Sequence, residues 1–467
     1  MDEEMAAARK TRWTPGVMVV DVLLVNAATI LTFLLRFISH FLKYGTLPMN
    51  NFVAYVTLWP WISVCTVILM QIYSLYNAHR KKWPEVFLSL ILVVFWLTVV
   101  SMALSFLLRG FAFPRSVFLI GFAVQLLFLT GWRRLLWRHE RRVFRVRRLM
   151  VVGPAGEAHA LANKLIEANL AFDDVALVVD GEENPELCGG ADPGRTVGGY
   201  ERFPLAVDAV GPEEVYICSG VPSEEKISFV NYLVSRGYPV FIVPDVYEIF
   251  ISRGRLEQVG DTPVFALNSP LTIPEEWRWL KRLIDILFSS VLLAVLSPLM
   301  LAIGLGVRLG SPGPAIYRQQ RITERGREFC VYKFRTMVEG AEKTSGPVLA
   351  SRNDPRLTRF GSFLRFTRLD EWPQLYNVLK GDMSLVGPRP ERPFFVRRFV
   401  QETPEYAYRL QVKSGITGLA QVSGRYSTDS NDKLKYDLLY VRGYSPLRDL
   451  VILLQTVKVI FMRDKAS

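Results

Sequence analysis

The stretch IDILFSSVLLAVLSPLMLAIGLGV, residues 284–307, decides how the second half of the chain meets a membrane. It is long enough for a helix to cross the hydrocarbon core. However, Ser297-Pro298 interrupts it, and a proline inside a helix removes a hydrogen bond and bends the chain. Cationic residues flank it on both sides: Arg278, Lys281, Arg282, Arg308 and Arg318. Both flanks therefore have the charge of cytoplasmic segments, and we predict a re-entrant helix over 281–308 rather than a full crossing or a buried core helix.

Four more apolar stretches precede this one, at residues 15–36, 52–76, 86–108 and 114–132. Each is close to the roughly 20 residues that a spanning helix needs. The N-terminus, the second connection and the eight arginines from Arg133 to Arg148 are basic, whereas the other two connections carry few cations. The positive-inside rule then predicts four spanning helices over residues 1–148 with both ends in the cytoplasm. Asp21 lies inside the first span, where pairing within the bundle or a functional role would explain it.

The net charge of +12 is confined to the same region of the chain. Residues 1–148 hold 18 Lys and Arg against 6 Asp and Glu, so the remaining 319 residues are neutral overall. A nucleic-acid-binding domain would carry its own basic excess, so anionic lipids are the expected partner and nucleic acid is not. The four cysteines are far apart and form no C-x-x-C pair, which signals neither a zinc site nor a disulfide framework.

Residues 149–270 change to short β-branched runs at 149–152, 175–179, 214–218 and 240–243, alternating with helical patterns at 157–169 and 223–236. This alternation predicts a Rossmann-like α/β domain with a parallel sheet, of regulatory or structural role. The first run leads into Gly153-Pro-Ala-Gly156, a degenerate form of the glycine-rich dinucleotide turn. A tight turn that binds no ligand explains this turn better than a nucleotide site does.

The chemistry is predicted to lie in residues 271–467, where paired acids stand among arginines and glycines. The four clusters are Lys333-Phe-Arg335-Thr-Met337, Leu369-Asp370-Glu371-Trp-Pro-Gln374, Gly387-Pro-Arg389-Pro390 and Gly424-Arg425. Phosphoryl transfer needs cations on the non-bridging oxygens and a nucleophile in line with the leaving group. Adjacent carboxylates repel one another unless their roles differ, so one of the pair can bind Mg²⁺ while the other attacks phosphorus.

These clusters, together with Lys281-Arg282 and Ser297-Pro298, resemble the polyprenol-phosphate hexose-1-phosphate transferases, also called large monotopic phosphoglycosyl transferases. The resemblance is close over residues 277–467 and looser over the whole chain. It implies a membrane helical bundle, a Rossmann-like domain and a monotopic α+β catalytic domain with a re-entrant helix. It also implies a place in the bacterial inner membrane, with catalysis on the cytoplasmic face, and suggests a homodimer.

The resemblance also implies a role for each matching residue. Asp370 would attack a UDP-sugar, release UMP and pass the sugar phosphate to undecaprenyl phosphate, at the start of exopolysaccharide, capsule or O-antigen synthesis. Glu371, with Asp370, would hold Mg²⁺. Substrate would be bound by Arg389, Pro390, Arg425, Lys333, Arg335 and Asp437. Lys281 and Arg282 would grip lipid head groups, while Ser297 and Pro298 would break the re-entrant helix.

Two departures from the family pattern lie outside the acid pair. Ser414 replaces the usual proline before Gly415, and Thr323 stands where the family has glycine. Neither change removes a catalytic group. The alternatives to a transferase are a non-enzymatic scaffold of polysaccharide assembly and a membrane nucleotide-sugar epimerase or dehydratase. The latter needs an intact glycine fingerprint and a Tyr-x-x-x-Lys pair, and residues 149–270 have neither.

Overall fold

The computed structural model describes residues 2–45, 49–107, 115–143, 148–167, 174–180, 196–252, 254–266, 272–340, 354, 356–424 and 430–462. By its internal contacts the chain forms two compact units, Met1–Pro244 and Asp245–Ser467.

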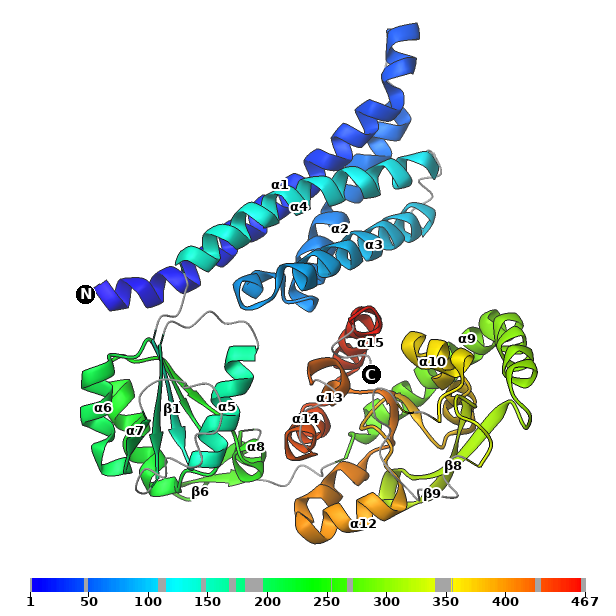
Figure 1. Cartoon of the computed structure of the whole chain (residues 1–467). Coiled ribbons are helices and arrows are strands. Elements are labelled where there is room, and N and C mark those ends of the chain that lie inside the picture. Colours follow the sequence, from blue (N-terminus) through cyan, green and yellow to red (C-terminus); the bar gives the residue numbers. More distant parts are fainter. Residues whose placement is uncertain are drawn as a thin grey trace. The chain divides into compact units, whose positions relative to one another are not determined.

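The first unit begins with four long helices, α1 (Asp2–Tyr44), α2 (Met49–Ile72), α3 (Trp83–Leu107) and α4 (Arg115–Val143). α1 lies against α4 and α2 against α3 (Figure 1). Three of these helices contain segments long and apolar enough to cross a membrane, Pro15–Ile38, Trp83–Leu107 and Ser116–Val143. The apolar part of α2 among the described residues, Val56–Ile72, is shorter. The predicted apolar helices are therefore present, and their composition is that of a membrane protein.

The acid inside the first predicted span is paired within this bundle. Asp21 is buried on α1 and forms an ion pair with Arg133 of α4, whose Nε donates to Asp21 Oδ1 at 3.1 Å. Arg133 Nη1 also donates to the carbonyl of Leu75 at 2.7 Å. A charge in an apolar bundle is tolerated when it is paired and hydrogen-bonded. The structure thus supports the pairing explanation for Asp21.

Next in the first unit comes an α/β region with a five-stranded parallel sheet in the order β3-β2-β1-β4-β5. Its strands are β1 (Arg148–Gly153), β2 (Asp174–Val179), β3 (Thr196–Gly198), β4 (Glu214–Ile217) and β5 (Val240–Ile242). Its helices are α5 (Ala155–Glu167), α6 (Phe203–Val210) and α7 (Ser223–Ser235). The prediction of a parallel sheet is confirmed, although β3 was not foreseen because it has only three residues.

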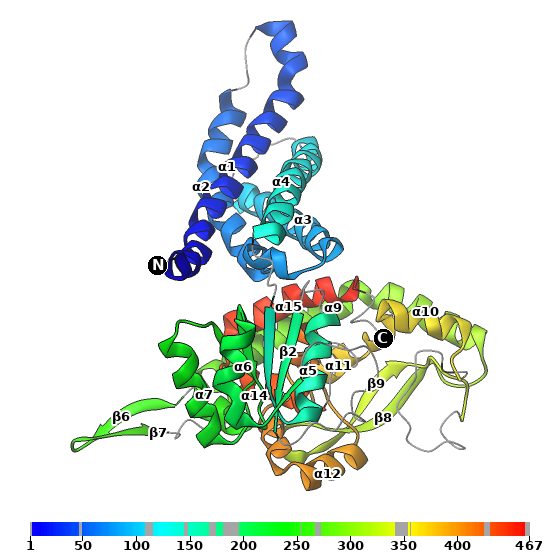
Figure 2. The same ribbon diagram turned by 60° about the vertical axis from the view of Figure 1, so that its left-hand side comes forward.

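Successive side chains of a strand point to opposite faces of the sheet, and each face packs in its own core. Because both faces are buried, the strands have continuous apolar sequences. Met150 and Val152 pack with residues of α6 and α7, whereas Leu149 and Val151 pack with α5. Figure 2 shows α5 on one side of the strands and α6 and α7 on the other.

The second unit starts earlier than the predicted boundary at 271. It includes α8 (Val246–Ile251) and the antiparallel hairpin of β6 (Arg255–Val259) and β7 (Thr262–Ala266). The physical reason lies in α8, where Ile249 is buried against Val396, Tyr406 and Leu438 of the second unit. This short helix is therefore part of the core of the C-terminal unit.

The longest helix of the second unit is α9 (Glu275–Gly310), which contains the deciding apolar stretch. Only 11% of its most apolar segment is buried inside the protein, so an apolar surface remains uncovered. Pro298 offers no N–H to the carbonyl of Ala294 four residues earlier. The hydroxyl of Ser297 donates to that same carbonyl at 2.9 Å. The Ser-Pro pair thus removes one hydrogen bond from the helix and satisfies the acceptor that it leaves open, but it does not break the helix, because α9 continues from Glu275 to Gly310.

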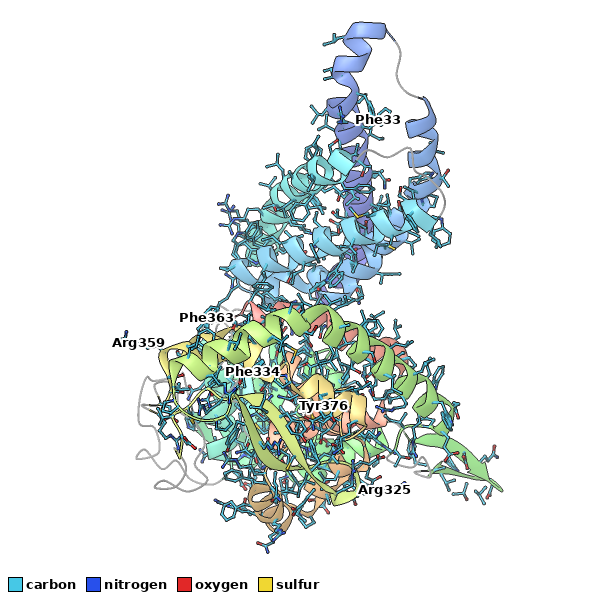
Figure 3. All side chains as sticks on the ribbon, turned by 90° about the vertical axis from the view of Figure 1, so that its right-hand side faces the viewer. Phe33, Arg325, Phe334, Arg359, Phe363 and Tyr376 are labelled. Atoms are coloured by element: carbon cyan, nitrogen blue, oxygen red, sulfur yellow. The ribbon has the colours of Figure 1, made fainter. Side chains whose placement is uncertain are left out.

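The remaining helices and strands of the second unit contribute to three hydrophobic cores. They are β8 (Ile316–Ile322), β9 (Glu328–Phe334), α10 (Arg359–Thr367), α11 (Gln374–Lys380), β10 (Ser384–Val386), α12 (Pro393–Glu402), β11 (Gly415–Thr417), α13 (Leu419–Ser423), α14 (Ser430–Arg442) and α15 (Pro446–Ile460). Strands β8 and β9 are antiparallel, and β10 and β11 are parallel. Phe334, labelled in Figure 3, packs with Ile303 and Val307 of α9 and Leu364 of α10. This contact joins the strand that carries Lys333 to the apolar helix.

Candidate active site

The acid pair lies on a 3₁₀ turn, η5 (Leu369–Glu371), that follows α10 directly. Arg368 joins the two elements in a left-handed conformation with φ 60°, which ends α10 and starts η5 without a loop. Such a conformation is uncommon for a residue with a Cβ, and strained positions of this kind cluster at functional sites. Asp370 and Glu371 are both buried.

The start of α10 is fixed to the end of β9. Thr358 caps the helix, with its hydroxyl accepting from the Gly361 N–H at 2.9 Å, and its own N–H donates to the Thr336 carbonyl at 3.0 Å. A Cβ on Gly361 would lie 2.0 Å from the same carbonyl oxygen, so only glycine allows this approach. The acid pair is therefore held in register with the strand that carries Lys333.

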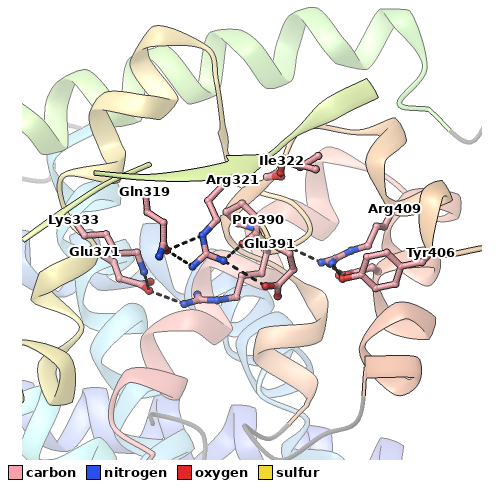
Figure 4. Close-up of polar contacts among 12 residues, drawn as sticks. Gln319, Arg321, Ile322, Lys333, Glu371, Pro390, Glu391, Tyr406 and Arg409 are labelled. Carbon is pink, nitrogen blue, oxygen red and sulfur yellow. Dashed lines mark hydrogen bonds and ion pairs between the residues drawn. The ribbon is translucent and has the colours of Figure 1, made fainter. Parts of the chain in front are cut away.

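Glu371 accepts hydrogen bonds from two cationic side chains, and Figure 4 shows it next to Lys333. Its Oε1 accepts from Lys333 Nζ of β9 and from Arg389 Nη2 of the segment after β10, each at 2.8 Å. Hydrogen bonds between ionised partners are stronger than neutral ones. Three of the predicted site residues are thus brought together beside Asp370.

The electrostatics of the two neighbouring acids differ. Burial, followed by the neighbouring Glu371 charge, raises the pKa of Asp370 to about 6. Burial alone would also raise the pKa of Glu371, but the charges of Arg389 and Lys333 hold it well below its usual range. Burial lowers the pKa of Lys333, against the attraction of Glu371. Glu371 is therefore held as an anion by its two cations, whereas at Asp370 burial and the Glu371 charge outweigh the attraction of Lys333, Arg365 and Arg368.

The donor set around these acids fits a magnesium ion shared with a substrate. Among the described residues, no group of three or more His, Cys, Asp or Glu side chains gathers to hold a metal alone. Mg²⁺ usually takes one or two carboxylates and completes its shell with water and substrate phosphates. Both cations contact Oε1 of Glu371, and within the described part of the chain no hydrogen bond occupies Oε2 or the Asp370 carboxylate. Two carboxylates are thus available to such an ion.

The segment that carries Arg389 is packed tightly against β11. A Cβ on Gly387 would lie 2.3 Å from the Lys413 carbonyl oxygen, and one on Gly418 would lie 2.2 Å from the Gly387 oxygen. The Gly387 N–H donates to the Thr417 carbonyl at 2.8 Å. Glycines at these positions let two backbone segments pass in contact, which fixes where the next residues begin.

Three other predicted substrate residues lie elsewhere or serve other contacts. Arg335 donates to the carbonyls of Ser311 and Pro312 at the end of α9 rather than to the acid pair. Asp437 of α14 forms a buried ion pair with Arg409 at 2.8 Å. Pro390 follows Arg389, and its carbonyl accepts from Arg321. Arg425 lies outside the described residues.

Lys281 and Arg282 also differ from expectation, because the protein itself binds both side chains. Lys281 is buried and its Nζ contacts Asp449 Oδ2 at 2.6 Å and the Val386 carbonyl at 2.9 Å. Arg282 donates to the carbonyls of Val378 and Leu379, each at 2.7 Å, at the end of α11. These contacts replace the expected grip on lipid head groups. They fasten the first turns of α9 to the catalytic elements.

Sequence reasoning missed several buried polar residues that shape the site. Asn377 of α11 is hydrogen-bonded to the backbone of β9. Its side chain accepts from the Tyr332 N–H at 3.0 Å and donates to the Cys330 carbonyl at 2.7 Å. Asp285 of α9 accepts from the Leu385 N–H at 3.0 Å. Both act on backbone groups distant in sequence, and no local pattern reveals such partners. An acid within an apolar helix, as at position 285, was the one available signal.

Comparison with known proteins places this site in a family. The family profile described as bacterial sugar transferase matches residues 276–463, which include all the site elements above. The UDP-N-acetylgalactosamine-undecaprenyl-phosphate N-acetylgalactosaminephosphotransferase of Aeromonas hydrophila is 38% identical over 226 residues, 48% of this chain and 52% of that protein. The UDP-glucose:undecaprenyl-phosphate glucose-1-phosphate transferase of Klebsiella pneumoniae is 40% identical over 261 residues, 54% of this chain and 56% of that protein.

The matched region thus spans about half the length of these two relatives. A shorter relative is covered more fully: the UDP-glucose:undecaprenyl-phosphate glucose-1-phosphate transferase of Caulobacter vibrioides is 42% identical over 191 residues, 40% of this chain and 71% of that protein. With a matching profile and a relative covered over more than two thirds of its length, the chain belongs to the bacterial sugar transferase family.

Proposed function

We propose that this protein is a phosphoglycosyl transferase that moves a sugar-1-phosphate from a UDP-sugar to undecaprenyl phosphate and releases UMP. The observation that carries the proposal is the buried Asp370 beside a Glu371 that is already neutralised by Lys333 and Arg389. The relatives' names specify the same class of donor and the same lipid acceptor. The reaction begins a polysaccharide such as an exopolysaccharide, capsule or O-antigen.

The reaction proceeds in two displacements at one phosphorus atom. A carboxylate oxygen of Asp370 bonds to the β-phosphorus of the UDP-sugar, and the bond from that phosphorus to the bridging oxygen breaks, so UMP leaves with the electron pair. A phosphate oxygen of undecaprenyl phosphate then bonds to the same phosphorus and restores the Asp370 carboxylate. Splitting one transfer into two steps in this way predicts ping-pong kinetics.

The charged groups around Asp370 have separate tasks in this scheme. Arg389 and Lys333 carry the positive charge that phosphoryl oxygens need during displacement. Asp370 and Glu371 would hold Mg²⁺ together with the substrate's phosphates, and the chemistry that this ion supplies is neutralisation of the pyrophosphate. Glu371 keeps the two cations beside the nucleophile, so that they do not depend on Asp370 itself.

The exposed apolar surface of α9 supports a membrane-anchored catalytic unit. Its basic flanks and the hydrogen bond that Pro298 removes from the helix favour a re-entrant helix, which would keep the active site on the cytoplasmic face of the bacterial inner membrane. UDP-sugars are cytoplasmic, so this orientation gives the site its donor. The basic ends of the bundle would bind anionic lipids.

The parallel sheet of the first unit has the strand order of dinucleotide-binding folds, and we interpret it as Rossmann-like. Its glycine turn contains a carboxylate, however. Glu157 Oε2 accepts from the Gly220 N–H at 3.0 Å, at the carboxyl end of the strands. A phosphate would be repelled there, so a structural or regulatory role fits this sheet better than a nucleotide-dependent epimerase.

The proposal is tested by measuring UMP release from a panel of UDP-sugars by the purified full chain with undecaprenyl phosphate and Mg²⁺. One sugar should turn over with the wild type and none with Asp370→Asn. Glu402→Gln on α12, which alters only a surface pair with Arg398, is the matched control and should retain activity. Release of UMP by Asp370→Asn at the wild-type rate would refute the assignment and favour a scaffold.

A further inference from the structure

The backbone that carries Arg389 is fixed by three donors at three successive carbonyls. The Arg389 carbonyl accepts from Arg409 Nη2 at 2.9 Å, and that of Pro390 accepts from Arg321 Nη1 at 3.0 Å. The Glu391 carbonyl accepts from the Ile322 N–H at 3.0 Å. Figure 4 shows Arg409 and Arg321 approaching this segment from different elements. Carbonyls of a surface loop can be satisfied by water, whereas these three accept from protein donors on other elements, which ties the segment to its surroundings.

Arg409 is itself held by buried groups. It forms the ion pair with Asp437 and donates from Nη1 to the hydroxyl of Tyr406, and all three side chains are buried. Burying an ion pair costs about as much free energy as the attraction returns, so such a pair is poor support for stability alone. Its clear geometric effect is to orient the guanidinium whose Nη2 reaches Arg389.

Arg321 is oriented in a similar way on the other side of the segment. Gln319 Oε1 accepts from both Nε and Nη2 of Arg321, at 3.1 and 2.6 Å, and Nη1 reaches the Pro390 carbonyl. Glu391 Oε2 lies 3.4 Å from the same nitrogen. A guanidinium has donors in a fixed planar fork, so binding two of them to Gln319 sets the direction of the third. A lysine would lack this fork.

We propose that Arg321, and Arg409 with its partner Asp437, are positioning residues that fix the backbone of Arg389 so that its guanidinium meets Glu371 and the donor's phosphates. This inference rests on the proposed function and deepens it. It also gives Asp437 a role at a distance, because Asp437 acts through Arg409 and then through the Arg389 carbonyl. Neither Arg321 nor Asp437 touches the reacting atoms.

The test is a double-mutant cycle on UMP release with the full chain, with kcat and KM for the UDP-sugar measured separately. Arg321→Lys and Asp437→Asn should each lower kcat about 10- to 100-fold and should change KM little. This is the loss expected when the Arg389 guanidinium is displaced by about 1 Å. In an Arg389→Ala background the same two changes should have almost no further effect on kcat. Residues with merely structural roles would lower kcat by the same factor in both backgrounds, and that result would overturn the proposal.

A milder pair of variants covers the case in which a buried change prevents folding. Gln319→Leu removes the acceptor that orients Arg321, and Gln320→Leu changes the adjacent exposed residue of β8. Only Gln319→Leu should lower kcat, and equal activity of the two variants would contradict the proposal. A wild-type protein that releases no UMP from any UDP-sugar would instead refute the proposed function, so the two failures are distinguishable.

Discussion

Replacing Asp370, the proposed nucleophile, should stabilise the protein while abolishing its activity. The pKa of Asp370 rises from 3.8 to about 6, roughly two units, and each unit corresponds to about 1.4 kcal/mol. Because Asp370 is almost fully buried, this shift corresponds to a penalty of about 3 kcal/mol for the ionised carboxylate at neutral pH. The folded-state pKa lies above the unfolded value, so stability declines as the pH rises through that interval and the whole penalty is present at pH 7.

Asp370→Asn has nearly the same shape and no charge, so it should remove this penalty. For a folded unit of this size, 1 kcal/mol corresponds to about 2–4 °C, which predicts an apparent Tm about 6–12 °C higher. The assay is thermal unfolding of the purified protein followed by tryptophan fluorescence at pH 7.5 and pH 5, and the gap should shrink at pH 5. Asp382→Asn is the control, because Asp382 is paired with Arg327 and Lys380 and its loss should not raise Tm. An Asp370→Asn variant that melts at or below the wild-type temperature would refute the reasoning.

Three further predictions concern the same unit. The wild-type rate of UMP release should fall as the pH drops through about 6, because a protonated Asp370 cannot attack phosphorus. Lys333→Met should move this acidic fall in rate to higher pH, because the lysine charge lowers the pKa of Asp370. Thr323→Gly should lower the free energy of unfolding by about 1–3 kcal/mol, because it leaves the buried Ser414 N–H unpaired. Ser414→Pro should lower it less in the Thr323→Gly background than in the wild type. Additive losses, measured by chemical unfolding, would count against this coupling. Gly361→Ala should lower both activity and apparent Tm, since its Cβ would meet the Thr336 carbonyl at 2.0 Å, and unchanged values of both would contradict the role of this close contact.

The Thr323 and Ser414 pair shows how a structure explains a departure that a sequence only records. Each residue differs from the family pattern, and separately neither change has an obvious purpose. In the structure Thr323 Oγ1 accepts from the Ser414 N–H at 3.2 Å, a bond that requires a side-chain oxygen at 323 and an N–H at 414. Glycine at 323 would lack the side-chain oxygen and proline at 414 would lack the N–H, so the two departures match one another.

The elements with strong local signals were predictable from the sequence. The apolar helices and the strands β1, β2, β4 and β5 follow from length and β-branched composition. The acid pair and its partners Lys333 and Arg389 follow from clustered motifs. The sequence does not predict the role of a basic side chain whose hydrogen-bond partner is a backbone carbonyl. Lys281, Arg282 and Arg335 all read as surface or substrate cations, yet each donates to carbonyls far away in the sequence.

The central claim is that Asp370 carries the sugar phosphate between donor and acceptor, and capture of that species tests it most directly. Purified protein would be mixed with Mg²⁺ and with the UDP-sugar that supports turnover, which carries a label in its sugar. Undecaprenyl phosphate would be left out. The reaction would then be quenched and the protein digested into peptides. We predict UMP release stoichiometric with enzyme and label on the peptide containing Asp370, discharged when undecaprenyl phosphate is added before the quench. An active wild type that carries no label, or label that persists on Asp370→Asn, would contradict the account.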